Sequence, residues 1–282
     1  MRKVSVIITI FNNSEFLTKC INSILRQSYS PKELILIDDG SLDDNTKKIY
    51  LKFKINKKKI KLKFYKIKNI GPSGARNFGL RKINHNYFCF FDPDDYMKKN
   101  FIRNKMLVFK KNTNNKIVGT YSNARIKNNK KFKDINYKIG LSSINNIDTI
   151  GYQNGISGSL PTYIFYKPLI PYSLKFDENI SINEDFDFII RLLKKKINII
   201  GINNHDLIIN SHNNSLTRSS ENIDLVYKNQ REFINKAFKL KYFSKKEINK
   251  RLKYIESLSA RSYLKKLDII NFIRHSLKYL SI

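Results

Sequence analysis

Short apolar runs alternate with helical patterns through the first 100 residues of the chain. Four runs predict strands at residues 4–10, 34–37, 62–67 and 87–91. The runs at 4–10, 34–37 and 87–91 are continuously apolar and predict buried strands. Apolar residues at helical spacing follow at 16–25, and further helices are predicted after Ser41 and after Pro72. Strands and helices that alternate with short links are typical of a parallel sheet covered by helices on both faces.

Two of the predicted helices are preceded by residues that cap helices. Residues 12–15, Asn-Asn-Ser-Glu, supply capping side chains before the first helix. Ser41 and Asp44 stand three residues apart and resemble a capping box, which predicts a helix from there to about residue 53.

The pattern is more mixed after residue 100. A helix is predicted at 97–110, and additional strands are predicted at 117–126, 132–139, 162–166, 197–202 and 207–209. The polar, Gly-rich segment 142–159 is a candidate mobile loop. Asn183-Glu184-Asp185 opens a helix predicted at 186–195, and the pattern from Ile223 onward is helical.

Composition indicates a globular protein with a substantial core. Of the 282 residues, 41% are hydrophobic, which excludes global disorder. Cys20 and Cys89 both lie in apolar runs, so we expect reduced core thiols in a cytoplasmic protein. No export signal is visible, and no window approaches the ~20 apolar residues that a membrane-spanning helix needs.

The chain carries a net charge of +31, part of which reflects Lys-rich composition throughout. Residues 223–282 hold 15 Lys or Arg and 5 Asp or Glu, so this region alone contributes +10. Its basic and apolar residues alternate at helical spacing, which fits an anionic membrane surface or a helical appendage on the core. Nucleic acid would also suit the charge, but no recognised binding motif is present, and we expect no nucleic-acid partner.

Polar residues gather where the first four strands end. They are Asn12, Asp38-Asp39, the segment 69–76 and Asp92 to Asp95. Ligands of parallel α/β sheets bind beyond the carboxyl ends of the strands, so these clusters predict a single site. Asp39, assisted by Asp38, can accept hydrogen bonds from a base or a ribose, and Arg76 is a planar donor for a phosphate or a base carbonyl.

The segment Asp92-Pro93-Asp94-Asp95 ends a buried strand in three carboxylates within four residues. Like charges that lose water repel each other, and a divalent cation with oxygen ligands relieves this cost. An acidic turn that caps the next helix would have the same sequence. Convergence of four strand ends favours the metal site.

These motifs together resemble family 2 glycosyltransferases. The resemblance rests on residues 4–11, the run Ile-Asp-Asp-Gly-Ser at 37–41, residues 69–77, Phe-Asp-Pro-Asp-Asp at 91–95 and Asn183-Glu184-Asp185. It is close to residue 100, looser to 195 and weak beyond. It implies a GT-A fold, a Rossmann-like, mostly parallel α/β sheet flanked by helices, with a helical C-terminal appendage. It also implies transfer of a hexose or N-acetylhexosamine from a nucleotide sugar with inversion.

The resemblance assigns roles position by position. Residues that would hold the nucleotide, most simply UDP, are Thr9, Phe11, Asn12, Asp38, Asp39, Asn69, Gly71, Arg76, Asp92 and Pro93. Asp94 and Asp92 would bind Mn²⁺ or Mg²⁺, supported by Asp95. His212 resembles a late family histidine that reaches the diphosphate or the metal, and a plain loop histidine stays an alternative. Asp185 would be the catalytic base, with Glu184 beside it.

The expected chemistry needs only one carboxylate base. A metal-neutralised nucleoside diphosphate leaves without the acidic carboxyl that glycoside hydrolases use, while Asp185 takes the proton of the acceptor hydroxyl. Segment 158–162 departs from the family pattern near the acceptor. Competing interpretations are a non-catalytic homologue that binds sugar nucleotides and a nucleotidyltransferase, although the latter's Gly-rich, Arg-containing loop is absent after Ile10.

The expected organisation follows from these assignments. A catalytic domain is expected at 1–222, with a nucleotide-binding half at 1–100 and an acceptor-binding half at 101–222, followed by a basic helical region at 223–282. The acceptor would be a hydroxyl of a glycan or a lipid-linked glycan of the bacterial cell surface. We expect a cytoplasmic protein that can associate peripherally with the inner face of the membrane. Neither the donor sugar nor the oligomeric state is specified by the sequence.

Overall fold

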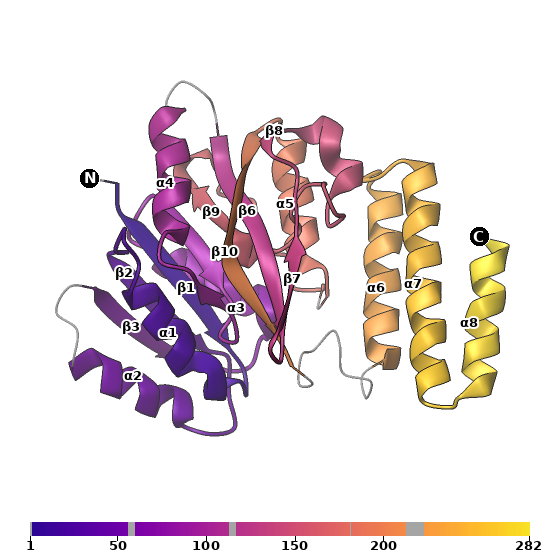
Figure 1. The fold of residues 1–282 in the computed structure, drawn as a ribbon, viewed down its shortest axis with the longest axis horizontal. Coiled ribbons are helices and arrows are strands. Elements are labelled where there is room, and N and C mark those ends of the chain that lie inside the picture. Colours follow the sequence, from indigo (N-terminus) through magenta and orange to yellow (C-terminus); the bar gives the residue numbers. More distant parts are fainter. Residues whose placement is uncertain (1, 56–59, 113–116, 181, 213–222) are drawn as a thin grey trace. The chain divides into compact units, whose positions relative to one another are not determined.

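The computed structural model of the protein describes residues 2–55, 60–112, 117–180, 182–212 and 223–282 (Figure 1). The chain forms two compact units. The sheet unit comprises Met1–Asn179 and Asp185–Ser211, and the helical unit comprises Ile180–Glu184 and His212–Ile282. The boundary predicted from the sequence, at residue 222, lies outside the described residues.

A ten-stranded sheet and five α-helices form the body of the sheet unit among its described residues. The strands are β1 (Val4–Ile10), β2 (Glu33–Asp38), β3 (Lys61–Lys66), β4 (Tyr87–Phe91), β5 (Tyr96–Met97), β6 (Ile117–Asn128), β7 (Lys131–Ile135), β8 (Gly140–Ser142), β9 (Tyr163–Tyr166) and β10 (Asn198–Ser211). The helices are α1 (Leu17–Leu25), α2 (Asn45–Ile55), α3 (Gly71–Lys82), α4 (Phe101–Lys111) and α5 (Glu184–Lys194). Short 3-10 turns are η1 (Ser14–Phe16), η2 (Ile144–Thr149), η3 (Leu160–Thr162) and η4 (Lys167–Leu169).

The strands run in the order β3-β2-β1-β4-β9-β6-β10-β5, with β7 beside β6 and β8 beside β10. The first four are parallel, as the βα alternation predicts, and their register places Ile10 beside Asp38 and Ile8 beside Phe91. The sheet is mixed, because β9 is antiparallel to β4 and β6, and β5 is antiparallel to β10. All residues of β2 and β4 are buried, which explains their uninterrupted hydrophobic runs.

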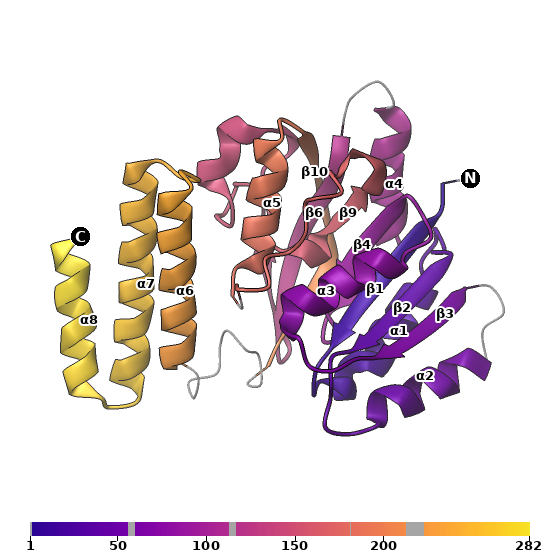
Figure 2. The ribbon, with the colours of Figure 1, turned by 180° about the vertical axis from the view of Figure 1, so that it is seen from behind.

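Helices cover both faces of the sheet (Figures 1 and 2). Alternate side chains of β4 point to opposite faces, and the two sets meet different helices. Phe91 contacts the ring of Phe101 on α4, whereas Phe88 and Phe90 belong to an aromatic cluster with Phe165, Phe176 and Phe188 of α5. This packing holds the carboxyl end of β4, where the acidic turn begins.

The predicted bounds of β10 and of α4 are wrong. The strands expected at 197–202 and 207–209 are one strand, β10, whose register with β6 shifts between Ile202 and Leu207. Polar residues in that interval interrupt the hydrophobic pattern without ending the strand. Met97, expected to open a helix, instead belongs to β5, which pairs with β10, and α4 begins at Phe101.

The predicted capping box at Ser41 and Asp44 is not formed. Helix α2 begins at Asn45, and the Ser41 hydroxyl instead accepts a hydrogen bond from the Asn12 N–H at 3.0 Å. Asn13 likewise makes no side-chain cap for η1. The Ser41 side chain therefore joins the loops after β1 and β2 and does not cap the helix that follows it.

The segment between β7 and β9 is more structured than a loop. Strand β7 ends at Ile135, earlier than the predicted residue 139, and β8 and η2 follow. The side chains of Ile147, Ile150 and Ile156 are buried there. These buried side chains explain why a stretch rich in Gly, Ser and Asn is nonetheless held in place.

The helical unit contains three α-helices among its described residues, as predicted: α6 (Ile223–Lys239), α7 (Lys245–Lys265) and α8 (Ile269–Ser281). A polar cluster joins them. Glu256 of α7 is fully buried, pairs with Arg231 of α6, and accepts a hydrogen bond of 2.7 Å from His275 Nδ1 of α8. None of the described helices combines the length and the hydrophobicity needed to cross a bilayer.

Candidate active site

The carboxyl ends of β1, β2 and β4 meet at one edge of the sheet. Because β1 lies between β2 and β4, the segments that follow Ile10, Asp38 and Phe91 are neighbours. The Asp39 N–H donates to the Ile10 carbonyl at 2.8 Å, which draws the second loop over the first. The predicted convergence of polar loops at this edge is therefore present.

The loop after β1 is fixed by the loop after β2. Asn12 has a positive φ of 50°, accepts a hydrogen bond from the Leu42 N–H at 2.9 Å, and donates its own N–H to Ser41. Phe11 beside it is 50% exposed, so its ring is available to a ligand at this edge. Thr9 is half-buried within β1, one strand position before Ile10.

Asp38 and Asp39 have different surroundings. Asp38 is fully buried and its Oδ1 accepts the Ser41 N–H at 2.8 Å, so it closes the turn after β2. Asp39 Oδ1 accepts the Ile70 N–H at 2.9 Å and thereby orients the start of α3. Burial raises the pKa of Asp39, and the N–H groups of Ile70 and Gly71 partly oppose that shift.

Close approach of two loops explains Gly40. A Cβ on Gly40 would lie 2.8 Å from the backbone nitrogen of Asn69, and φ is +79°. Gly71, which begins α3 before Pro72, also has φ +79°. Asn69 is exposed beside this contact, so the 69–71 backbone lies directly next to the turn after Asp39.

Arg76 of α3 connects two acidic residues that are 93 positions apart in the sequence. It is 7% exposed, its Nη2 lies 3.8 Å from Asp92 Oδ1, and its Nη1 lies 3.5 Å from Asp185 Oδ1. The guanidinium also stands 5.8 Å from the ring centroid of Phe176. One buried cation therefore lies between the acidic turn after β4 and the start of α5.

The acidic turn separates its carboxylates into two groups. Asp95 is 4% exposed, and its Oδ1 accepts the Asn210 N–H of β10 at 3.1 Å. Its own N–H bonds the Asp92 carbonyl at 3.2 Å, which closes the turn around Pro93. Asp92 and Asp94 stay half-exposed. Asp95 thus supports the turn, while Asp92 and Asp94 face solvent.

A divalent cation fits this turn if phosphate oxygens of a bound substrate complete its coordination shell. Among the residues that the structure describes, no group of three or more His, Cys, Asp and Glu side chains is arranged to hold a metal. Mg²⁺ and Mn²⁺ are commonly held by one or two carboxylates, with substrate phosphates and waters completing the shell. The two half-exposed carboxylates match that pattern. His212 is half-buried directly after β10 and belongs to the helical unit.

The start of α5 places Asp185 beside the segment that departs from the family pattern. Asp185 Oδ2 accepts the Leu160 N–H at 3.1 Å, and a Cβ on Gly158 would lie 2.0 Å from the ring of Phe186. Glu184, the first residue of α5, is half-buried. The 158–162 segment therefore contacts Asp185 through the Leu160 N–H, and it contains no aromatic or basic residue.

Sequence reasoning assigned no role to several supporting residues. Asn77 follows Arg76, accepts the Phe176 N–H at 2.8 Å, and donates to the Phe176 carbonyl and to Glu178. It belongs to the matched run 69–77, so the motif pointed to it. Phe176 lies outside every motif, and only the fold brings it under Arg76.

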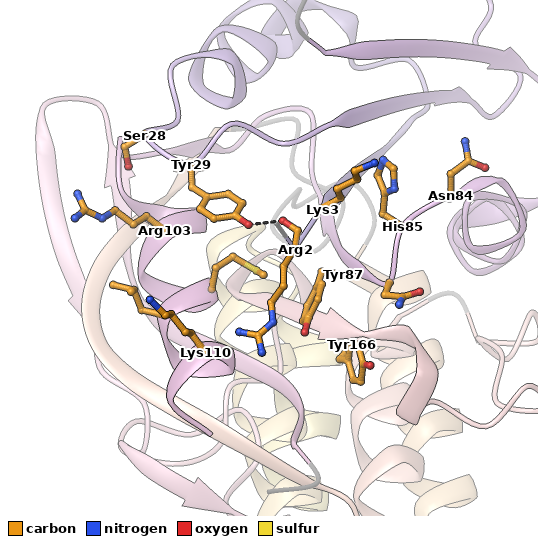
Figure 3. A pocket seen from close by; sticks show the side chains of 13 residues that line it. Arg2, Lys3, Ser28, Tyr29, Asn84, His85, Tyr87, Arg103, Lys110 and Tyr166 are labelled. Atoms are coloured by element: carbon orange, nitrogen blue, oxygen red, sulfur yellow. Dashed lines mark hydrogen bonds between the residues drawn. The ribbon is translucent and has the colours of Figure 1, made fainter. Parts of the chain in front are cut away.

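A cavity of about 990 Å³ lies at the opposite ends of the strands (Figure 3). Its lining includes Arg2 and Lys3, which precede β1, and Tyr87, the first residue of β4. A five-residue strand spans ~16 Å, so this cavity is separated by the sheet from the residues described above. It is not the predicted nucleotide site.

The fold and the site define a glycosyltransferase of the GT-A type. The chain belongs to glycosyl transferase family 2, because the sequence model described as "Glycosyl transferase family 2" matches residues 5–171, more than half of the chain. The resemblance noted from the motifs is confirmed, and the protein is an enzyme of this class.

Comparisons with individual proteins agree on fold and class. The cholesterol galactosyltransferase of Borreliella burgdorferi is 27% identical over 213 residues, covering 72% of this chain and 58% of that protein. S. aureus TarS 1-349 in complex with UDP-GlcNAc is similar in structure, with a TM-score of 0.65, 19% identity and coverage of 99% and 92%. The mannosyltransferase PcManGT of Pyrobaculum calidifontis, in complex with GDP-Man and Mn²⁺, has a TM-score of 0.62, 13% identity and coverage of 99% and 74%. Matches to curated relatives span 14% to 58% of their lengths.

Proposed function

We propose that the protein transfers a hexose or N-acetylhexosamine from a UDP-sugar to a hydroxyl group of a glycan or lipid-linked acceptor, with inversion and with a divalent metal. The observation that carries the proposal is the position of Arg76 between Asp92 and Asp185. A cation there suits a reaction in which a diphosphate leaves on one side and a proton is taken on the other. UDP is favoured by the TarS complexes, which contain UDP and UDP-GlcNAc.

The nucleotide would be held by the loops after β1, β2 and β3. Asp39 has one oxygen engaged by the Ile70 N–H and would offer the other to the uracil or the ribose. Phe11 would contact the base, while Thr9, Asn12, Asp38, Asn69 and Gly71 would shape the backbone around it. Arg76 would donate hydrogen bonds to the diphosphate, where its planar fork matches two oxygens.

Asp94 and Asp92, next to Pro93, would hold Mn²⁺ or Mg²⁺ together with the diphosphate oxygens. The bound cation would supply Lewis-acid neutralisation of charge on the leaving diphosphate. Asp95 would keep the turn in shape through Asn210, and His212 is retained as a further candidate ligand because it follows that strand. The Mn²⁺ complex of PcManGT supports a metal in this fold.

Asp185 would accept the proton of the acceptor hydroxyl. Its Oδ2 is held by the Leu160 N–H and its Oδ1 faces Arg76, so the carboxylate has a fixed orientation. Glu184 beside it would contact the acceptor. A single base is sufficient for direct displacement, which gives inversion at the anomeric carbon.

Hydrolysis and transfer with UDP-, GDP-, CDP- and dTDP-sugars, each with Mn²⁺ or Mg²⁺, test the proposal. We expect a UDP-sugar to be consumed, and we expect Asp185→Asn to lower turnover by about 10²–10⁴-fold while UDP still binds. Asp43→Asn, a change in the exposed turn before α2, serves as the control. Full activity of Asp185→Asn would show that Asp185 is not the catalytic base.

Two outcomes would favour the alternative functions. UDP binding without turnover by the parent chain would support a non-catalytic homologue that binds sugar nucleotides. Salt-sensitive binding to nucleic acid that is tighter than binding to UDP would support a nucleic-acid-binding protein.

A further inference from the structure

Helix α8 of the helical unit turns its apolar side outward. Its exposed large side chains are Ile269 (50%), Ile270 (76%), Ile273 (49%), Leu277 (62%) and Leu280 (75%). Positions 270, 273, 277 and 280 follow one another by three or four residues, so they form one stripe along the helix. A surface helix of a globular protein normally directs such a stripe toward the core.

The side of α8 that faces the other helices is polar instead. His275 is 3% exposed, its Nδ1 donates to Glu256 Oε2 at 2.7 Å, and its ring stacks on that of Tyr263 with the centroids 5.1 Å apart. His275 is two residues from both Ile273 and Leu277, about 200° around the helix, so the stripe points away from α7. The polar cluster holds α8 in this orientation without the help of the stripe.

Positive charge borders the stripe. Arg274 and Lys278 each follow a stripe residue and are exposed, and α8 contains no acidic residue. Lys278 Nζ also donates to the Tyr227 hydroxyl of α6 at 3.3 Å. The last residue of α7, Lys265, and the turn residues Lys266 and Leu267 are exposed as well, Leu267 by 81%. Residues 223–282 carry 15 basic and 5 acidic side chains, a net charge of +10.

We propose that the outer stripe of α8 binds the surface of an anionic lipid bilayer, with the helix lying parallel to it. An apolar face bordered by cations buries its aliphatic side chains at the acyl boundary while its charges meet anionic headgroups. A second copy of the chain is a poorer occupant, because two surfaces of net +10 repel each other. The stripe also spans fewer than the three or four heptads that a coiled coil requires. This inference goes beyond glycosyl transfer and does not depend on it.

The absence of Trp from the chain permits a direct measurement. Leu277→Trp places a single fluorophore on the stripe, and Tyr172→Trp places one at a 94%-exposed position of the sheet unit. With vesicles of phosphatidylcholine and phosphatidylglycerol, we expect the emission of Leu277→Trp to shift to shorter wavelength and to be quenched by brominated lipid. The emission of Tyr172→Trp should not change. Equal behaviour of the two variants contradicts the proposal.

Sedimentation of the full chain with vesicles measures the strength of binding. Ile273→Ser/Leu277→Ser should lower binding about tenfold or more, because two aliphatic side chains are lost from the interface. Arg274→Gln/Lys278→Gln should lower binding to anionic vesicles by about tenfold or more and should not change binding to neutral ones. Both pairs are exposed, and unchanged thermal unfolding verifies the fold of each variant.

Three further results overturn the proposal. They are no vesicle binding by the parent chain at low salt, binding that the Ile273→Ser/Leu277→Ser variant retains, and a stripe-dependent dimer detected by light scattering in the absence of lipid. These measurements involve neither sugar donor nor acceptor. Their failure would therefore leave the proposed transfer reaction untouched, and a failed transfer assay would leave the lipid measurements valid.

Discussion

Arg76 Nη1 lies 3.5 Å from Asp185 Oδ1, although the two residues come from α3 and α5 and are more than 100 positions apart in the sequence. The distance indicates an ion pair rather than a short bidentate hydrogen bond. Arg76 therefore fixes the position of Asp185 through charge rather than through a short hydrogen bond. This relationship connects the nucleotide side of the site with the acceptor side.

Arg76→Lys should lower kcat/KM for sugar transfer by about 10²-fold. The compact ammonium group of a lysine cannot contact Asp92, Asp185 and a diphosphate at the same time, as a planar guanidinium can. Arg81→Lys provides the matched control, since Arg81 is exposed near the end of the same helix. Steady-state kinetics and thermal unfolding of both variants give the comparison. If Arg76→Lys turns over like Arg81→Lys, Arg76 does not connect the two sides.

Asp39→Asn should weaken UDP binding by about tenfold or more and leave the protein as stable as before, or more so. Burial raises the pKa of Asp39, so ionised Asp39 costs free energy in the folded state at neutral pH. Asparagine removes that cost, and its Oδ1 still accepts the Ile70 N–H. Calorimetric titration with UDP and a thermal melt measure the two effects. A large loss of stability with unchanged UDP binding would show that Asp39 serves only the fold.

Asp94→Ala and Asp95→Ala should separate metal binding from support of the turn. Asp95→Ala leaves the partly buried Asn210 N–H without this acceptor, which costs about 1–3 kcal/mol and lowers Tm by several degrees. Asp94→Ala should leave Tm unchanged, abolish the Mn²⁺ dependence and lower turnover. Melts and Mn²⁺ titrations of transfer activity test both. A lower Tm for Asp94→Ala, together with lost Mn²⁺ dependence for Asp95→Ala, would contradict this division of roles between the two carboxylates.

Glu33 predicts a pH dependence of stability in the sheet unit. Burial alone would raise the pKa of Glu33, but Lys63 at 2.5 Å, the Ser5 hydroxyl at 2.7 Å and the Asn84 N–H outweigh it, so the pKa is lowered from 4.5. The stabilisation is therefore present above pH 4.5 and is lost as the pH falls through the folded-state pKa. Glu33→Gln should cost about 1–3 kcal/mol at neutral pH.

Urea unfolding of the parent and of Glu33→Gln, from pH 7 to about pH 3, measures this dependence. We expect the difference in unfolding free energy to shrink toward the acidic end. Asp43→Asn, an exposed change, should give no such trend. A difference that is constant with pH would assign the loss to packing rather than to charge.

Much of the fold was predictable because three of the first four strands, β1, β2 and β4, are almost entirely buried, whereas β3 is only partly buried. Continuous apolar runs such as Tyr87–Phe91 coincide with β4, and parallel alternation placed the acidic and glycine-rich loops at one edge. The sequence was misleading where polar residues occur inside an element. Asn203 to Asp206 interrupt the hydrophobic pattern of β10, and the two-residue strand β5 is too short to leave any pattern.

The site was predictable as a set of residues but not as a geometry. The pairing of Arg76 with Asp185 and the bond from Asn12 to Ser41 join positions that no local spacing relates. Ser41 followed by Asp44 satisfies the capping pattern, yet the neighbouring loop takes the hydroxyl. Likewise, the inward turn of Asp95 depends on Asn210, more than 100 residues away. Tertiary contacts decide which of several equivalent acids serves the fold and which faces a ligand.

A crystal structure with UDP and Mn²⁺, with the metal located by its anomalous scattering, tests the central claim most directly. The account predicts an anomalous peak at about 2.0–2.3 Å from a carboxylate oxygen of Asp94, the diphosphate within hydrogen-bond distance of Arg76, and the nucleoside beside Asp39. A manganese peak remote from Asp94, or a nucleotide bound away from the carboxyl ends of β1, β2 and β4, would contradict it.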